Sequence, residues 1–136
     1  MAFVADAAQL IRIKSEHDVV LARTAVKTLS SQLGFSLVNQ TKIVTAASEL
    51  ARNTLEHGGG GQVQIESIEL GSRVGIRMRF EDEGPGISDI AQALTDGFTT
   101  GKGMGLGLSG SKRLMDEFDI QSKPGFGTTV IISKWK

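Results

Sequence analysis

The sequence predicts an α+β fold, a two-layer sandwich in which helices cover one face of a largely antiparallel or mixed sheet. Apolar and polar residues alternate strictly over residues 73–82, as they do in a half-buried strand. Residues 15–33 and 37–57 instead carry apolar residues at helical spacing. Because alternating strands keep one polar face, we expect the helices to pack on the other face only.

Length and composition favour a single domain over residues 1–136. A chain of 136 residues can bury most of its apolar surface in one core. A formal net charge of zero and a hydrophobic content of 40% favour neither nucleic-acid binding nor intrinsic disorder. The chain has no cysteine and no apolar run of about 18 residues, so we expect no disulfide, thiolate metal site or membrane span. The expectation is a cytoplasmic protein that contacts neither nucleic acid nor membrane.

The first predicted elements are a short strand over Gln9–Lys14 and a helix that begins after Ser15. Ser15 and Asp18 have the spacing of a capping box, which satisfies backbone N–H groups at a helix start. The apolar stripe continues to about Leu33, and Gly34 ends the helix. The stripe consists of Val19, Ala22, Val26 and Leu29.

A longer helix is predicted from about Leu37 to His57, where the four glycines 58–61 end it. Glu49 and Asn53 are four residues apart, so they share a helix face that borders the buried stripe. Together they could hold magnesium through oxygen atoms, or Glu49 could take a proton while Asn53 holds the ion. The alternative is that they only solvate the helix, and His57 is interpreted as a helix-end histidine. The inward residues are Ile43, Ala46, Ala47, Leu50 and Ala51.

Two strands follow at Gln62–Leu70 and Arg73–Asp82, joined by a turn at Gly71-Ser72. In the second strand the two-residue period places Asp82 on the apolar face, at the very end of the strand. A carboxylate at that position either caps the turn through residues 84–86 or binds a polar ligand at the rim of the sheet. The residues alone leave both interpretations open.

The last third of the chain is predicted to contain two helices and a hairpin. Their bounds are Asp89–Leu94 with Ser88 as the cap, about Gly105–Phe118, and the strands Asp119–Lys123 and Thr128–Lys134 around a turn at residues 124–127.

A glycine-rich loop at Gly97–Gly110 contains six of the seventeen glycines and leads into the last predicted helix. A backbone without Cβ atoms can wrap around a polyanion, so we interpret the loop as a phosphate cradle. Its spacing does not fit a P-loop, and its match to the dinucleotide fingerprint is weak because no buried strand precedes it. A disordered linker is the alternative, but a linker would not need the apolar residues that alternate with the glycines, Met104, Leu106 and Leu108.

Four short motifs occur in an order that resembles the four boxes of the GHKL ATPases, which have the Bergerat ATP-binding fold. The motifs are Glu49-x-x-x-Asn53, Asp82-x-Gly84-x-Gly86, Gly103-x-Gly105-x-Gly107 and Gly127-Thr128. Within that superfamily, four strings are similar to the RsbT-type switch kinases of bacterial stress-response partner-switching modules. These are SELARN at 48–53, EDEGPGI at 81–87, DGFTT at 96–100 and KRLMDEF at 112–118.

The resemblance implies an ATP site. Asp82 would accept a hydrogen bond from the adenine amino group, with support from Thr128 through water. The small residues Gly84 and Gly86 would let the base approach the backbone. The lid over the phosphates would consist of Gly103, Met104, Gly105, Leu106 and Gly107.

The resemblance also implies a phosphoryl-transfer step that uses magnesium. Asn53 would coordinate the ion between the phosphates, and Glu49 would orient or deprotonate the attacking hydroxyl. The implied activity is that of an ATP-dependent serine/threonine protein kinase.

The implied partner is a STAS-domain protein that supplies the acceptor hydroxyl, with a PP2C-type phosphatase as a second partner. Within the fold, the alternative is an anti-sigma factor that binds a sigma factor and phosphorylates its antagonist. Outside it, the alternative is a non-catalytic module gated by nucleotide, which intact Glu49 and Asn53 argue against. A histidine kinase fragment is disfavoured because the chain has no room for a dimerisation helix pair.

Overall fold

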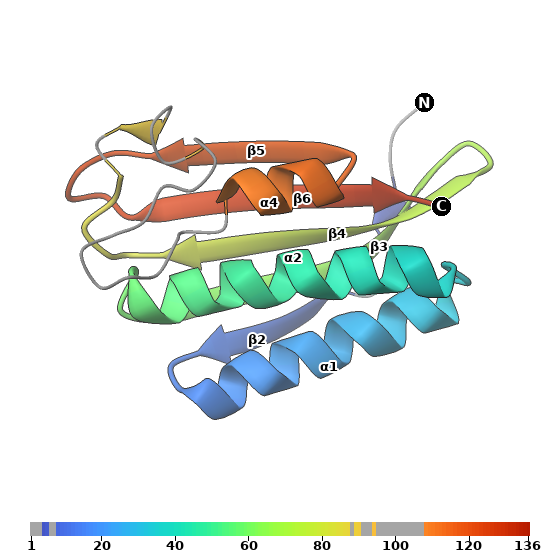
Figure 1. Cartoon of the computed structure of the whole chain (residues 1–136), viewed down its shortest axis with the longest axis horizontal. Coiled ribbons are helices and arrows are strands. Elements are labelled where there is room, and N and C mark those ends of the chain that lie inside the picture. Colours follow the sequence, from blue (N-terminus) through green and yellow to red (C-terminus); the bar gives the residue numbers. More distant parts are fainter. Residues whose placement is uncertain (1–3, 6–7, 88, 91–93, 95–107) are drawn as a thin grey trace.

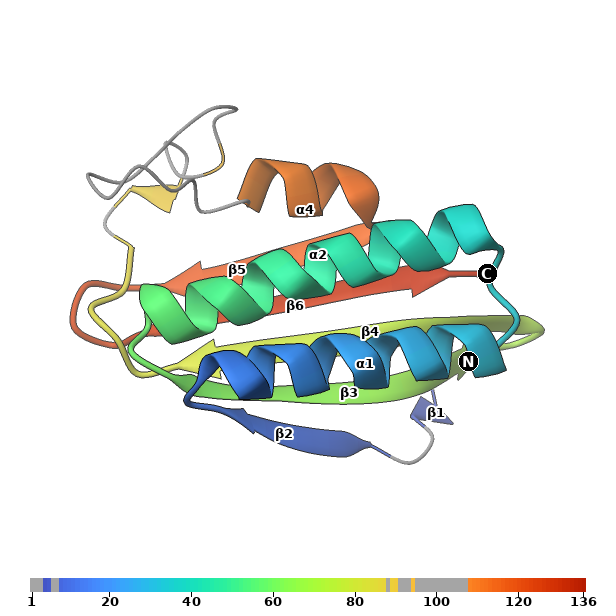
Figure 2. The same cartoon turned by 60° about the horizontal axis from the view of Figure 1, so that its bottom comes forward.

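The computed structural model describes residues 4–5, 8–87, 89–90, 94 and 108–136. In this part of the chain, three helices lie on one side of an antiparallel sheet (Figures 1 and 2). The glycine loop up to residue 107 falls outside the described residues. So does most of the helix predicted over 89–94, although the Leu94 N–H donates to the Ile90 carbonyl at 3.0 Å.

The sheet has the strand order β1-β3-β4-β6-β5, and β2 pairs with β3 along the same edge as β1. Every pairing between the described strands is antiparallel, which decides between the antiparallel and mixed alternatives. The central strand β4 lies between β3 and β6 over nearly its whole length. The strands are β1 (Val4–Ala5), β2 (Gln9–Ile13), β3 (Gly61–Leu70), β4 (Arg73–Asp82), β5 (Glu117–Ser122) and β6 (Thr128–Trp135).

The helices are α1 (Glu16–Gln32), α2 (Leu37–Glu56) and α4 (Leu108–Leu114). At the start of α1, the Ser15 hydroxyl accepts from the Asp18 N–H at 3.3 Å, and the Asp18 carboxylate accepts from the Lys14 N–H at 2.9 Å. After the helix, Gly34 has a φ of 85°, a conformation that glycine adopts without strain. The predicted start and end of this helix are therefore confirmed.

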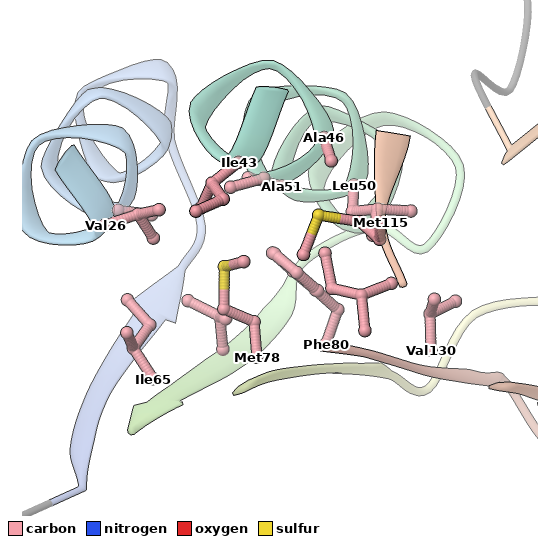
Figure 3. Packing of buried hydrophobic residues seen from close by; sticks show 14 of the residues in the cluster. Val26, Ile43, Ala46, Leu50, Ala51, Ile65, Met78, Phe80, Met115 and Val130 are labelled. Carbon is pink, nitrogen blue, oxygen red and sulfur yellow. The ribbon is translucent and has the colours of Figure 1, made fainter. Parts of the chain in front are cut away.

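The core lies between the helices and the sheet, and the predicted apolar faces form it. Figure 3 shows Met78 and Phe80 of β4 pointing toward Ile43 and Leu50 of α2. Both Met78 and Ile43 are completely buried. The α+β prediction with helices on one face is thus confirmed, because the apolar face of β4 is the face that the helices cover. No helix in the described ranges is long and apolar enough to cross a membrane.

The helix predicted to run to Phe118 was wrong at its C-terminal end. The structure ends α4 at Leu114 and places Phe118 in β5, opposite Ile132 of β6. The Leu114 carbonyl accepts a hydrogen bond from the Lys134 ammonium at 3.1 Å, which satisfies a carbonyl at the helix end. Pairing with β6 therefore overrides the helical pattern, which local sequence cannot anticipate.

Candidate functional site

Three elements end or begin at one corner of the molecule: α2 and β4 end there, and β6 begins there (Figure 1). The strand register places Asp82, the last residue of β4, opposite Gly61 on one side and Thr128 on the other. Asp82 is half-buried at this corner. The register therefore brings together residues that are more than forty positions apart in the sequence, as Asp82 and Thr128 are.

The Asp82 carboxylate holds two backbone segments through a single oxygen. Its Oδ1 accepts from the Gly84 N–H at 2.9 Å and from the Thr128 N–H at 3.2 Å. Among the described residues, no donor reaches Oδ2. The turn-capping interpretation thus accounts for one carboxylate oxygen and does not account for the other.

Burial raises the pKa of Asp82 above its ordinary value. The N–H groups of Gly84 and Thr128 and the nearby charge of His57 oppose the rise, but burial has the larger effect. A carboxylate in this environment is poorly solvated, so a hydrogen-bond donor on a ligand would be strongly favoured there.

The surface beside Asp82 is made of backbone. A Cβ at Gly58 would lie 2.4 Å from the Asp82 Cγ and 2.6 Å from Oδ2, and a Cβ at Gly84 would lie 2.7 Å from the Gly58 Cα. A side chain at position 58 would therefore displace the carboxylate. Asp82 and Gly58 also line a cleft of about 490 Å³, together with Arg12 and Lys14. Gly58 was predicted from the sequence only as part of a helix stop, because nothing in the run of four glycines marks one of them as a neighbour of Asp82.

The predicted residue Gly86 has a different structural setting from Gly84. It has a φ of 78°, and a Cβ there would lie 2.1 Å from the Lys123 carbonyl oxygen. The adjacent Pro85 carbonyl accepts from the Gly125 N–H at 2.8 Å. Gly86 therefore allows the turn after β4 to pack on the hairpin between β5 and β6, whereas Gly84 packs against Gly58.

Asn53 and Glu49 lie on α2, with Asn53 nearer to this corner and Glu49 farther from it. The Asn53 carbonyl accepts from the N–H groups of His57 and Gly58, at 2.9 and 3.1 Å, so Asn53 lies one turn before the glycine that touches Asp82. Glu49 is exposed and precedes Asn53 by four residues, or about 6 Å of helix rise. Arg52 is directed elsewhere, because its guanidinium pairs with Glu16 of α1 at 3.3 Å.

A magnesium ion held by protein and phosphates together fits the residues at this corner. Magnesium typically takes one or two protein oxygens and completes its shell with phosphates and water. The described residues contain no group of three or more His, Asp or Glu side chains that could hold an ion by themselves. The single amide of Asn53 is the kind of ligand that a nucleotide-bound magnesium ion would use.

Ser122, which lies at the end of β5 opposite Thr128, was not predicted from the sequence as a site residue. Its hydroxyl contacts the Ile87 N–H at 2.7 Å, the Gly127 carbonyl at 3.0 Å and the Thr128 hydroxyl at 2.8 Å. No local pattern marks this serine, because its partners come from three separate stretches of the chain. The predicted lid residues 103–107 lie outside the described residues.

The family model for histidine kinase-, DNA gyrase B-, and HSP90-like ATPases matches residues 38–136. The chain belongs to this ATPase family. The match covers the residues of all four predicted boxes, from Glu49 to Thr128. The predicted GHKL resemblance is therefore confirmed.

Individual relatives within the family include kinases and anti-sigma factors. The serine/threonine-protein kinase RsbT of Bacillus subtilis (strain 168) is 46% identical over 125 residues, which cover 92% of this chain and 94% of that protein. The anti-sigma F factor of Thermoanaerobacter sp. (strain X514) is 34% identical over 128 residues, covering 90% and 87%. Identity this high over nearly the whole of both chains confirms the predicted enzyme class, a serine/threonine protein kinase.

Two solved structures share the fold at low sequence identity. The RsbU and RsbW domains of Rv1364c from Mycobacterium tuberculosis align with a TM-score of 0.64 at 20% identity, over 95% of this chain and 32% of that one. The nucleotide-free catalytic domain of the histidine kinase ThkA aligns with a TM-score of 0.53 at 16% identity, over 93% and 95%. These alignments confirm the ATPase fold.

Proposed function

We propose that this family member is a switch kinase that transfers the γ-phosphate of ATP to a serine or threonine of a STAS-domain partner. The observation that carries the proposal is the Asp82 carboxylate, which is held by Gly84 and Thr128 through one oxygen and leaves the other for a ligand. An acceptor at this position suits the exocyclic amine of adenine and does not suit the carbonyl of guanine.

In this proposal, the adenine lies against the backbone surface formed by Gly58 and Gly84. Asp82 accepts from its amino group, and Thr128 supports the contact through water. Because glycine occupies both backbone positions, no side chain keeps the planar base away from the carboxylate. Gly86 contributes indirectly, since it lets the loop pack on the neighbouring hairpin.

The order of polar residues along α2 supports the placement of the phosphates. In the proposal, a nucleotide with its base at Asp82 would extend back along α2 from the end of the helix, so that its phosphates would meet Asn53 first and the γ-phosphate would reach the level of Glu49. We assign Asn53 as the magnesium ligand and Glu49 as the group that orients or deprotonates the acceptor hydroxyl. When bound, magnesium neutralises charge on the phosphates. The lid would be formed by residues 103–107.

The acceptor hydroxyl is proposed to come from another folded protein. Glu49 is exposed on the helix surface, so a docked partner can reach it. A phosphate on the acceptor would add about −1.5 to −2 charges beside Glu49, and the repulsion would favour release of the product. The freed surface could then bind a second partner, which we propose is a PP2C-type phosphatase.

A second candidate function is that of an anti-sigma factor kinase, which the relatives named anti-sigma F factor support at 32–34% identity. That protein would bind a sigma factor directly and phosphorylate its antagonist. The two functions differ in the proteins that bind the chain in the presence of ATP.

The test uses radiolabelled ATP with magnesium and the STAS-domain proteins encoded near the gene. We expect label on a serine or threonine of one such protein, and weaker binding of the kinase to the phosphorylated form than to the unmodified form. Copurifying sigma factor would favour the second candidate. Rapid ATP hydrolysis by the chain alone, with no label on any partner, would refute the switch-kinase proposal.

A further inference from the structure

The Ser122 hydroxyl is the centre of a hydrogen-bond cluster that joins three segments at the proposed adenine corner. Its contacts are Ile87 in the turn after β4, Gly127 in the hairpin turn, and Thr128 at the start of β6. The strand register places Ser122 opposite Thr128, and Thr128 opposite Asp82. The three side chains therefore form a row across β5, β6 and β4 on one face of the sheet.

The hydrogen-bond capacity of Ser122 decides which atoms donate. A hydroxyl can donate once and accept twice. The Ile87 N–H can only donate, so it occupies one acceptor position, and the Gly127 carbonyl can only accept, so it takes the single Ser122 proton. The remaining acceptor position of Ser122 is then filled by the Thr128 hydroxyl, 2.8 Å away, which must be the donor.

The opposite orientation would satisfy fewer groups. If Ser122 donated to Thr128, the Gly127 carbonyl would lose this donor although Gly127 is buried. A buried carbonyl without a donor is costly, so the first orientation is preferred. With its proton directed to Ser122, the Thr128 hydroxyl offers only lone pairs to a ligand or to a bridging water.

We propose that Ser122 is a positioning residue that sets nucleobase specificity, because it holds the Thr128 hydroxyl as an acceptor beside the acceptor Asp82. This inference rests on the proposed adenine site. A bridging water that donates to both acceptors can only accept from the base, so the pair matches the amino group at purine position 6 and is mismatched with a carbonyl there. Ser122 does not touch the base itself and acts through Thr128.

Without Ser122, the Thr128 hydroxyl is free to rotate and can donate to the bridging water, which can then donate to a 6-oxo purine. The Ser122→Ala variant should therefore bind inosine triphosphate relatively better than the natural protein does. A role limited to holding the loops together would weaken the binding of all purine nucleotides by the same factor. The ratio of the two affinities thus separates positioning from structural support.

The experiment measures dissociation constants of ATP and inosine triphosphate with magnesium by calorimetry. These nucleotides differ at position 6, with an amino group in one and a carbonyl in the other. We expect the preference for ATP to fall about fivefold to tenfold in Ser122→Ala, as for one reoriented hydrogen bond. Ser122→Thr, which keeps the hydroxyl, should retain the preference. Ser122→Ala should have no further effect on the preference in a Thr128→Ala background.

An unchanged ratio in folded Ser122→Ala would overturn the inference, as would an equal loss of both affinities. If Ser122→Ala does not fold, Thr128→Ala decides, because it should also lose part of the preference and an unchanged ratio refutes the role of its hydroxyl. Asp82→Asn tests the adenine site separately. If that variant binds ATP normally, the proposed site fails; if it loses ATP while Ser122→Ala keeps the ratio, only the specificity role of Ser122 fails.

Discussion

Replacing Asp82 with asparagine separates its binding role from its structural role. The asparagine carbonyl can still accept from the Gly84 and Thr128 N–H groups, which lie 2.9 and 3.2 Å from Oδ1 in the natural protein. The turn cap is therefore preserved. What is lost is a charged acceptor for the adenine amine, since the second position becomes an NH₂ donor. A charge-assisted hydrogen bond contributes about 1.5–3 kcal/mol, so the dissociation constant for ATP should rise about tenfold to a hundredfold.

The Asp82→Asn substitution should weaken ATP binding, but it should not lower the free energy of unfolding at neutral pH. Because the pKa of Asp82 is raised in the folded state, folding favours its protonated form, and this contribution is lost as the pH rises through that pKa. At neutral pH the ionised carboxylate thus costs stability, and Asp82→Asn should be at least as stable as the natural protein. The advantage of the variant should shrink as the pH falls through the raised pKa of Asp82, and it should be gone below about 4, where Asp82 is protonated in both states.

Calorimetry with ATP and GTP measures the first effect, and denaturant unfolding measures the second. Trp135 is the only tryptophan and lies in β6, so its fluorescence reports on unfolding of the sheet. A folded variant that keeps the full affinity for ATP would refute the adenine role and leave only the turn cap. A large loss of stability at neutral pH would refute the argument that the cap survives.

Gly58→Ala should weaken ATP binding and destabilise the fold by about 1–3 kcal/mol, because its Cβ would displace Asp82. Gly59→Ala has open space around it but a φ of 73°, so it should cost some stability and keep the affinity, and calorimetry compares the two variants. Glu49→Ala should bind ATP but lose about 10²–10⁴ in the rate of phosphate transfer, and normal transfer by this variant would exclude a base role. Asn53→Ala should instead lose the magnesium-dependent part of ATP binding. Leu50→Ala should lower the free energy of unfolding by about 2–5 kcal/mol, whereas Leu37→Ala, at an exposed position, should lower it by less than about 0.5 kcal/mol. Trp135 fluorescence measures both losses, and equal losses would contradict the assignment of Leu50 to the core.

The regular elements were predictable because their signals are local. The capping box at Ser15 and the left-handed glycine at Gly34 bounded α1 correctly, since both depend on neighbours within a few residues. The alternation of β4 likewise predicted its buried face. The end of α4 was not predictable in this way, because pairing of Phe118 with Ile132 opposed the local helical pattern.

The sequence by itself determined which chemical groups are present and, through the two-residue period, that Asp82 would lie on the core side of its strand. Only the tertiary structure decided what surrounds that carboxylate. Strand register, which depends on contacts between distant segments, brought Thr128 beside it, and helix packing placed Gly58 against it. The same register put Ser122 opposite Thr128. A hydrogen bond between residues from separate strands leaves no periodic trace in either strand, which is why the direction of the Thr128 proton could be inferred only from the folded chain.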